Sequence, residues 1–385
     1  TGGTVRDTAG DAISLTSTKG VSLSWMNVTS NLGSGIRGSG VNGFTLSNSS
    51  ISDNGNDVTT DESGINMTGL TGAASISNST ISNNYEFEVQ IANNTGLLSN
   101  LQLTNDTIAS NGLSGVHGNL VNFLATGTAN MTLNVSGGSY TGAAPATATG
   151  IHADASGGTV VANVSGATLT SNNVGVNVSA ALNGNLTFDV NGNTFTGTRS
   201  HGVNYFISAN HTGTSSGKVR NNLMGTIGVT NSGSATGFGV RVQNEAAGNA
   251  TVLITGNTIV EMAATAINVN HGILGSPLAG TTAATITNNV IANVAARAII
   301  VQQNIGAGTV CADIAGNTLT GILGQAGDGT RIRIRQLAGG TFNVRQKAAT
   351  VAVDAQELDD ANGSTAAQIS VSGTFNYNSG GCTQP

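Results

Sequence analysis

The densest group of acidic residues occupies one enlarged loop in the first part of the chain. Asp53, Asp57 and Asp61 lie there, with Asn and Gly between the first two and Glu62 directly after the third. Closely spaced oxygen ligands with a glycine among them suit Ca²⁺, which takes roughly six to eight oxygens. The spacing departs from that of an EF-hand, and a solvated acidic loop explains the same residues. Calcium at Asp53, Asp57 and Asp61 is therefore the one cofactor that the sequence suggests.

Two histidines follow similar apolar pairs further along the chain. His117 comes after Gly115-Val116, and His152 comes after Gly150-Ile151. If these pairs begin equivalent strands of consecutive turns, both imidazoles point outward about 5 Å apart, a geometry that can hold a metal ion. The other residues at this position are mostly Asn, Ser and Arg. We therefore favour a polar outer face over a metal site.

Basic residues gather near the C-terminal end. Arg331, Arg333 and Arg335 alternate along one predicted strand, and Arg345 and Lys347 follow closely. Acidic residues come next in the sequence, so a local ion-pair network at the end of the molecule is one interpretation. The other is a patch at Arg331, Arg333 and Arg335 that binds an anion or a partner.

The chain contains two cysteines, Cys311 and Cys382, and neither belongs to a metal-ligand spacing. A disulfide between them would pin the C-terminal tail against an earlier turn. In the chain-entropy model a loop of this length stabilises the fold by roughly 4 kcal/mol. Such a bond implies an oxidising compartment, whereas two free thiols are the alternative.

Short apolar motifs recur along most of the chain and must position these side chains. In each copy a small residue precedes Ile or Val, and copies follow one another after about 23 to 37 residues, the range of a solenoid repeat. The clearest copies are Ala12-Ile13, Gly35-Ile36, Gly64-Ile65, Gly115-Val116, Gly150-Ile151, Gly175-Val176, Gly202-Val203, Gly239-Val240 and Ala266-Ile267. Because repeat proteins grow by adding units, we expect one long domain.

A second motif in each repeat has Asn or Gly at a fixed position. These two residues accept a left-handed backbone most readily, so the position predicts a corner between two strands. The column comprises Asn48, Asn78, Asn105, Gly166, Gly192, Gly256, Asn288 and Gly316. Trp25 stands at the same position in the first copy, where we expect an irregular turn, because a bulky residue would be strained there. A further column, which predicts a second corner, is Asn31, Asn54, Asn84, Asn111 and Asn172.

Each repeat then consists of short strands between corners, and stacking the repeats pairs every strand in parallel with its copies around one apolar core. The Asn-x-Thr-Ile and Gly-Ile repeats resemble those of the right-handed parallel β-helix proteins, the pectin-lyase-like superfamily, which includes many secreted and surface-displayed bacterial proteins. The resemblance implies an all-β, right-handed parallel β-helix, or β-solenoid, of about 11 to 12 coils. We assign 1–320 to the repeats and 321–385 to final coils and a strand-rich C-terminal cap.

Composition and charge exclude some partners. Charged residues make up 8% of the chain and hydrophobic residues 38%, which favours an ordered, strand-rich protein. A net charge of −6 argues against nucleic acid as a partner. No apolar stretch approaches the roughly 20 residues of a transmembrane helix. Because Thr1 begins without a leader sequence, we expect either that a leader has been removed or that the chain is part of a longer polypeptide.

The residues favour a structural function over catalysis. Asp106, Asp154 and Asp189 fall at different places in their repeats and form no acid pair in one column, and aromatic residues are 4% of the chain. We therefore expect an extracellular or cell-surface structural and adhesive β-solenoid with a surface glycan or cell-wall partner, able to assemble end to end. The alternatives are a carbohydrate-active β-helix enzyme, a polysaccharide lyase or glycoside hydrolase with groove walls near 53–63, 137–149 and 225–238, and a glycan- or receptor-binding fibre module.

Overall fold

Short strands with alternate side chains buried make up most of the protein. In β18 (Thr159–Ser165), for example, Val160, Ala162 and Val164 are buried, whereas the residues between them are partly exposed. The structure is a computed structural model. It describes residues 2–56, 62–110, 118–143, 148–245, 247–272, 279–304, 308–324, 329–337, 339–345, 362–363, 368–378 and 382–385.

The chain divides into two compact units. The first comprises Thr1–Asn177 and Gly184–Leu186, and the second comprises Val178–Asn183 and Thr187–Pro385. The division falls within β20 (Val174–Ala181) and β21 (Asn185–Asn191).

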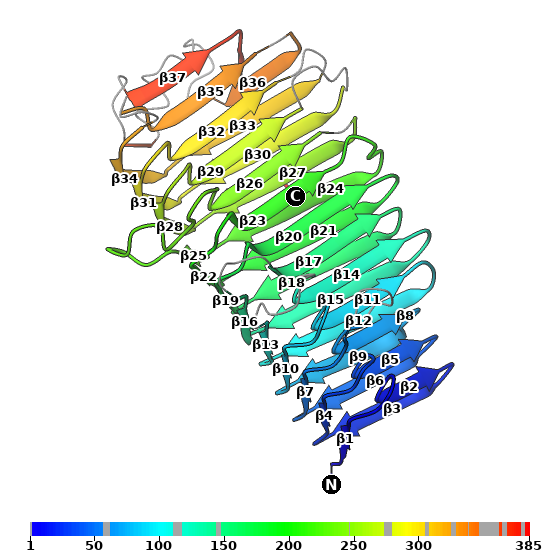
Figure 1. Ribbon diagram of the computed structural model, residues 1–385. Helices are drawn as coiled ribbons and strands as arrows, with labels where there is room; N and C mark the ends of the chain where they lie inside the picture. The colour runs from blue at the N-terminus through cyan, green and yellow to red at the C-terminus, as the bar shows by residue number, and fades with distance from the viewer. Residues whose placement is uncertain are drawn as a thin grey trace. The chain divides into compact units, whose positions relative to one another are not determined.

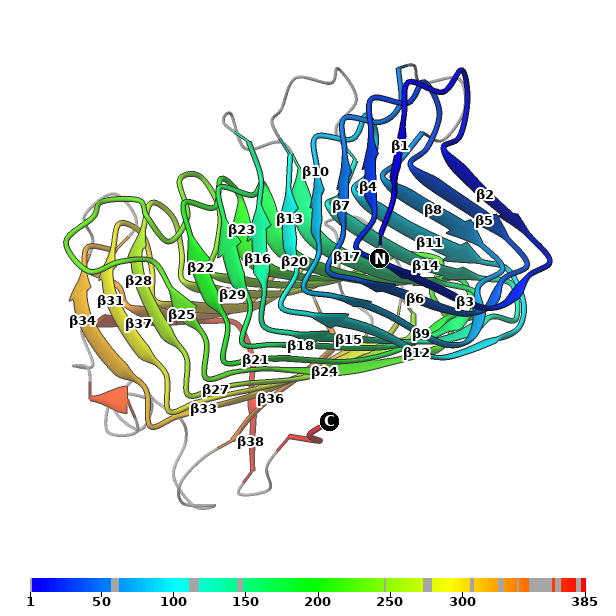
Figure 2. The ribbon, with the colours of Figure 1, turned by 90° about the horizontal axis from the view of Figure 1, so that it is seen from below.

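Three parallel sheets, A, B and C, build the first unit, and each strand pairs with the equivalent strands of the neighbouring turns (Figure 1). Figure 2 shows the three rows, which begin at β1, β2 and β3. Sheet A contains β1 (Thr4–Arg6), β4 (Asn27–Thr29), β7 (Ser50–Ser52), β10 (Thr80–Ser82), β13 (Thr107–Ala109), β16 (Ser139–Thr141) and β19 (Thr168–Thr170). Sheet B contains β2 (Ile13–Thr16), β5 (Ile36–Ser39), β8 (Ile65–Thr68), β11 (Val89–Asn93), β14 (Val121–Thr126) and β17 (Thr149–Ser156). Sheet C contains β3 (Lys19–Ser24), β6 (Asn42–Ser47), β9 (Thr71–Ser77), β12 (Leu97–Thr104), β15 (Asn130–Ser136) and β18.

The second unit repeats the same order of sheets. Sheet A contains β22 (Thr194–Thr196), β25 (Leu223–Met224), β28 (Thr258–Met262), β31 (Val290–Val294) and β34 (Thr318–Ile322). Sheet B contains β23 (His201–Ile207), β26 (Val240–Asn244), β29 (Ile267–His271), β32 (Ile299–Gln303), β35 (Ile332–Gln336) and β37 (Ile369–Ser372). Sheet C contains β24 (Thr214–Arg220), β27 (Asn249–Thr255), β30 (Thr281–Thr287), β33 (Thr309–Ala315), β36 (Thr341–Arg345) and β38 (Asn376–Asn378).

The predicted all-β, right-handed parallel β-helix is confirmed. Equivalent apolar residues stack on one another from turn to turn: Ile36 pairs with Ile65 and Ile65 with Val89, and all three are fully buried. Such stacking gives each unit a continuous apolar core that no single strand could bury alone. In the part of the chain that the structure describes, no helix has the length and apolarity needed to cross a bilayer.

The first predicted corner is present in every turn that the sequence motif identified. All eight Asn and Gly residues of that column have a positive φ, from 48° at Asn78 to 69° at Gly316. Trp25 adopts the same conformation, with φ 57°. Its backbone N–H donates to Ser47 O, as Asn48 N–H donates to Ser77 O one turn later. The expectation of an irregular turn at Trp25 was therefore wrong: the corner is kept and the indole lies 64% exposed to solvent.

The second corner lies one residue earlier than the sequence indicated. Asn111 of the predicted column lies outside the described residues. The left-handed residues are Ser30, Asp53, Asn83 and Ser171, with φ between 55° and 60°. The Asn that follows each of them is buried instead, and these amides bond from turn to turn. Asn31 Nδ2 donates to Asn54 Oδ1 at 2.7 Å, and Asn54 Nδ2 donates to Asn84 Oδ1 at 2.8 Å.

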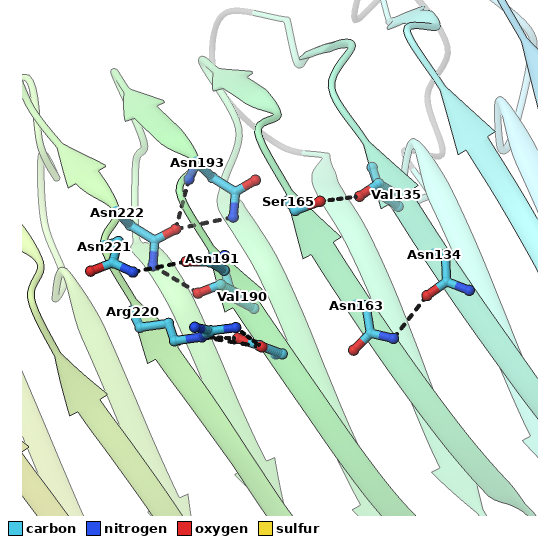
Figure 3. Close-up of polar contacts among 11 residues, drawn as sticks. Asn134, Val135, Asn163, Ser165, Val190, Asn191, Asn193, Arg220, Asn221 and Asn222 are labelled. Atoms are coloured by element: carbon cyan, nitrogen blue, oxygen red, sulfur yellow. Dashed lines mark hydrogen bonds and ion pairs between the residues drawn. The ribbon is translucent and has the colours of Figure 1, made fainter.

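A longer ladder of buried amides follows the first corner in the second unit. In each pair, the side-chain and backbone N–H groups of one Asn donate to the Oδ1 of the next, and the side-chain bonds measure 2.8–3.0 Å. Figure 3 shows the first of these pairs, Asn193 and Asn222. The ladder comprises Asn193, Asn222, Asn257, Asn289, Asn317 and Asn362. Every rung thus satisfies polar groups that the core would otherwise leave unpaired.

Candidate functional site

The acidic loop lies largely outside the described residues. Asp53 occupies a left-handed corner with φ 55°, whereas Asp57 and Asp61 fall in the segment 57–61, which the structure does not describe. Among the residues it does describe, no group of three His, Cys, Asp or Glu side chains is placed to hold a metal ion. Calcium at Asp53, Asp57 and Asp61 stays a prediction.

Two buried acids of the first unit have structural partners. Glu88 is 2% exposed and accepts hydrogen bonds from Asn84 Nδ2 at 2.6 Å and Asn84 N at 3.2 Å, so it ends the amide ladder of the second corner. Burial raises the pKa of Glu88 to about 8. Asp106 is fully buried, accepts from the backbone N–H groups of Ser79 and Thr104, and has its pKa raised by burial to about 6. Glu88 thus continues a column of Asn side chains, and Asp106 continues a column of Ser side chains, from one turn to the next.

His152 has an amide beside it in the preceding turn. The strand that pairs with β17 begins at Val121, so Asn122 takes the position next to His152, and the assignment of His117 to this column was wrong. His117 itself lies outside the described residues. His152 Nδ1 lies 3.1 Å from Asn122 Oδ1 and 3.0 Å from Asn119 Nδ2, and burial lowers its pKa.

The three arginines near the C-terminal end have different environments. Arg333 and Arg335 project from β35 on the side opposite to the fully buried Ile332 and Ile334. Arg331 precedes the strand and donates from Nη1 to Leu319 O at 3.0 Å. The outer face thus presents two of the three arginines, and an anion or partner patch at Arg331, Arg333 and Arg335 stays a prediction.

Cys311 of β33 and Cys382 are joined in a disulfide, with their Cα atoms 5.6 Å apart. The bond ties the C-terminal tail to sheet C. It closes a loop with a sequence separation of 71.

Arg333 and Arg335 belong to a larger polar surface, the outer face of sheet B in the second unit, which we call the sheet-B face. Its side chains alternate with core residues such as Val203, Val242 and Val269, all fully buried. Parallel register aligns them in two columns from turn to turn. One column runs Asn204, Arg241, Asn268, Ile300 and Arg333, and the other runs Phe206, Gln243, Asn270, Gln302 and Arg335, so each column contains one apolar residue among polar ones.

Several amide side chains of this face are buried although they point away from the core. Asn204, Gln243 and Asn268 are only 6–9% exposed. Arg241 Nη1 donates to Asn204 Oδ1 at 3.3 Å, and Asn270 Nδ2 donates to Gln243 Oε1 at 3.1 Å. The Oδ1 atoms of Asn268 and Asn270 are buried and accept no hydrogen bond within the described structure. An unpaired buried acceptor costs about 1–3 kcal/mol, so both oxygens gain from a donor brought by water or a ligand.

The sheet-B face presents amide and guanidinium groups. Strands β23, β26, β29, β32 and β35 contain no Asp or Glu, so they offer no acid pair for glycoside chemistry. Asn and Gln both donate and accept hydrogen bonds, and guanidinium groups pair with carboxylates in a fixed fork. Burial lowers the pKa of Arg241, but an arginine stays charged in proteins. Together these groups suit a ligand with many hydroxyls and some carboxylates.

Sequence reasoning identified one of the two columns. Asn204, Arg241 and Asn268 directly follow the Gly-Val or Ala-Ile motif and were recognised as an outward position. Gln243, Asn270 and Gln302 lie two residues further along each strand, and the alternation of the strand is the signal that could have found them. Their burial depends on neighbouring turns and has no signature in a single repeat.

Comparison of the chain with protein-family models, with curated proteins and with solved structures found no match. The resemblance to the pectin-lyase-like superfamily therefore rests on the repeat motifs alone.

Proposed function

We propose that the protein is an extracellular or cell-surface β-solenoid with a structural and adhesive function, and that it binds an acidic glycan along the sheet-B face. The two columns of amide and guanidinium groups carry the proposal, because they present hydrogen-bond donors and acceptors on successive turns of one face. Glycan hydroxyls pair with such groups in a repeating array. Arg241, Arg333 and Arg335 add positive charge along the same two columns.

The resemblance to pectin-lyase-like proteins supports a secreted location of bacterial type, and so does the disulfide between Cys311 and Cys382. We favour binding over hydrolysis or elimination because a carbohydrate-active enzyme of this fold would need carboxylates among the groups that contact the sugar. The five strands of the sheet-B face contain none.

Glycan binding is tested with a soluble uronate polymer and an uncharged glucan, titrated into the full chain by calorimetry. We expect the uronate to bind and the glucan to bind at least about tenfold more weakly, because arginine pairs with carboxylates. Arg335→Gln and Asn270→Ala should each weaken uronate binding by about tenfold. Arg6→Gln, which removes an exposed arginine of the first unit, is the matched control.

Absence of binding to both polymers would overturn the proposal for this face. Equal losses in Arg6→Gln and Arg335→Gln would show that uronate binding reflects overall charge. Release of shortened or unsaturated products from the uronate would favour the enzyme alternative instead.

Association of chains end to end is a second part of the proposal. Inward-facing residues of the first turn, Ile13, Leu15, Val21 and Leu23, are only partly buried, whereas Ile36 of the next turn is fully buried. Cryo-electron micrographs at rising protein concentration should show end-to-end rods that are lost in Leu15→Lys. Single rods at all concentrations would contradict this part.

A further inference from the structure

One residue departs from the rule of the second corner. At this position the described turns place Asn, Asp, Ser or Gly in the left-handed conformation, as at Asn293 and Gly321. Glu261 occupies the equivalent position, since Val260 pairs with Ala292 and Met262 with Val294, and its φ is 56°. A left-handed residue with a long side chain costs about 1–2 kcal/mol. Strain of this kind concentrates at functional positions, which gives the contacts of the Glu261 carboxylate particular interest.

The turn before Glu261 contains an inserted loop at the same corner. The chain leaves sheet A after Met224 and returns at Ser234, which bridges to Met262. Hydrogen bonds within the loop, such as Val229 N to Thr226 O at 3.0 Å, keep it compact. The loop contacts Glu261 directly, because Gly228 N–H donates to its Oε1 at 2.9 Å.

The two oxygens of this carboxylate differ. Oε1 accepts from Gly228 N–H and from Asn293 Nδ2, the latter at 2.7 Å. Oε2 accepts no hydrogen bond from the described residues and is not sealed from solvent. The residue as a whole is 9% exposed, so the free oxygen faces a confined space.

That space is a hollow of about 380 Å³ between the loop and the corners of the next three turns. Glu261, Asn231, Asn293 and Thr230 provide its polar groups, and the other side chains are apolar, among them Met262 and Leu323. None of the residues that line it is Lys, Arg or His. Leu323 of the lining is 63% exposed, and Ile227 of the inserted loop is 72% exposed.

We propose that this hollow binds a protonated amine carried on a small apolar body, with the ammonium group on Glu261 Oε2. The single carboxylate has no cationic partner in the lining, and its free oxygen matches an N⁺–H donor. Met262, Val294 and Leu323 then cover the apolar part of the ligand. This site is separate in its chemistry from the sheet-B face, which suits anions, and the inference does not depend on glycan binding.

A divalent cation fits less well. Ca²⁺ takes roughly six to eight oxygens, usually with several carboxylates. The hollow offers one carboxylate, and Asn293 turns its Nδ2 towards that group. Apolar side chains fill much of the remaining lining, which suits an alkyl or ring group better than hydrated metal.

The test is an NMR titration of the full chain at pH 7, with n-butylammonium as the probe and n-butanol as its neutral analogue. We expect saturable shifts of the Asn231 and Asn293 side-chain amides with n-butylammonium and at least tenfold weaker binding of n-butanol. Glu261→Gln keeps an oxygen for Gly228 N–H and removes the charge, so it should weaken the amine at least tenfold. Leu323→Ser, at an exposed residue, should weaken it severalfold, whereas Asp7→Asn, which removes an exposed acid elsewhere, should leave it unchanged.

Equal affinity for n-butanol and n-butylammonium in the unaltered protein would overturn the inference without any variant. So would an unchanged amine affinity in Glu261→Gln, or displacement of the amine by millimolar Ca²⁺ with shifts of the same amides. Failure of uronate binding would leave the amine site standing, because the two experiments report on different residues.

Discussion

Asn84 donates a 2.6 Å hydrogen bond from Nδ2 to Oε2 of Glu88, so a buried carboxyl ends a ladder of amides. The pKa of this carboxyl is raised to about 8, chiefly by burial. Between pH 5 and pH 8 the folded protein therefore holds a proton that the unfolded chain has released, and the free energy of unfolding falls as pH rises.

Replacing Glu88 by Gln should remove most of this pH dependence. Gln keeps an acceptor for Asn84 and has no charge to bury, so we expect Glu88→Gln to be more stable than the unaltered protein at pH 9 by about 2–4 kcal/mol. At pH 5 the two should agree within about 1 kcal/mol. Guanidinium unfolding at both pH values measures the difference, in which the contribution of Asp106 cancels. A constant difference at the two pH values would show that Glu88 is ionised throughout.

Trp25 holds a left-handed corner with a large, exposed side chain. Trp25→Asn should raise the free energy of unfolding by about 1 kcal/mol, because Asn accepts this conformation at lower cost. Leu97→Asn is the control, since Leu97 is similarly exposed at 55% and lies within a strand. The melting temperatures of the two variants are compared. A rise in Trp25→Asn alone is expected, whereas a rise in both would mean that removal of exposed apolar surface, and not relief of backbone strain, is the cause.

Asn257 is a central rung of the long amide ladder. Its Oδ1 accepts from Asn222 Nδ2 and Asn222 N, and its Nδ2 donates to Asn289 Oδ1 and Val219 O. Asn257→Ala leaves several buried groups unpaired and should destabilise the protein by about 3 kcal/mol or more. Asn249→Ala, at an exposed position of the preceding strand, should change stability by less than about 0.5 kcal/mol. Chemical denaturation measures the free energy of unfolding of both variants. Equal losses would show that the ladder contributes no more to stability than an exposed side chain does.

The disulfide between Cys311 and Cys382 should make stability depend on redox conditions. Because it closes a loop with a sequence separation of 71, its reduction should cost about 4 kcal/mol in the chain-entropy model. Melting curves with and without a thiol reductant measure the loss. In the double variant Cys311→Ser, Cys382→Ser the reductant should have no effect, and any remaining effect would have another cause.

The fold could be predicted because its signals recur in every turn. Asn48, Gly166 and Gly256 mark one corner, and the alternation of Ile and Val marks the buried side of each strand. The register of the strands was harder to predict where two candidate strand starts lie close together in the sequence. Val116 follows Gly115 and so matches the motif, whereas Val121 follows Leu120 and does not, and only strand pairing shows that Val121 begins β14.

The candidate sites were less predictable because they depend on contacts between turns. Glu261 looks ordinary in the sequence, and its importance emerges once its position is aligned with Asn293 and its carboxylate is placed under the loop. Burial of Asn268 likewise comes from neighbouring strands. A repeat motif contains the shape of one turn, whereas a binding site is assembled from several turns that differ.

The disulfide also determines how the protein carries mechanical load. A pull on the residues after Cys382 passes through the sulfur bond directly to Cys311 in β33. The strands between these two cysteines, β34 to β38, are then bypassed by the force. Tension on the tail therefore reaches the paired strands of sheet C first at β33, and the segment between the cysteines carries none of it while the bond is intact.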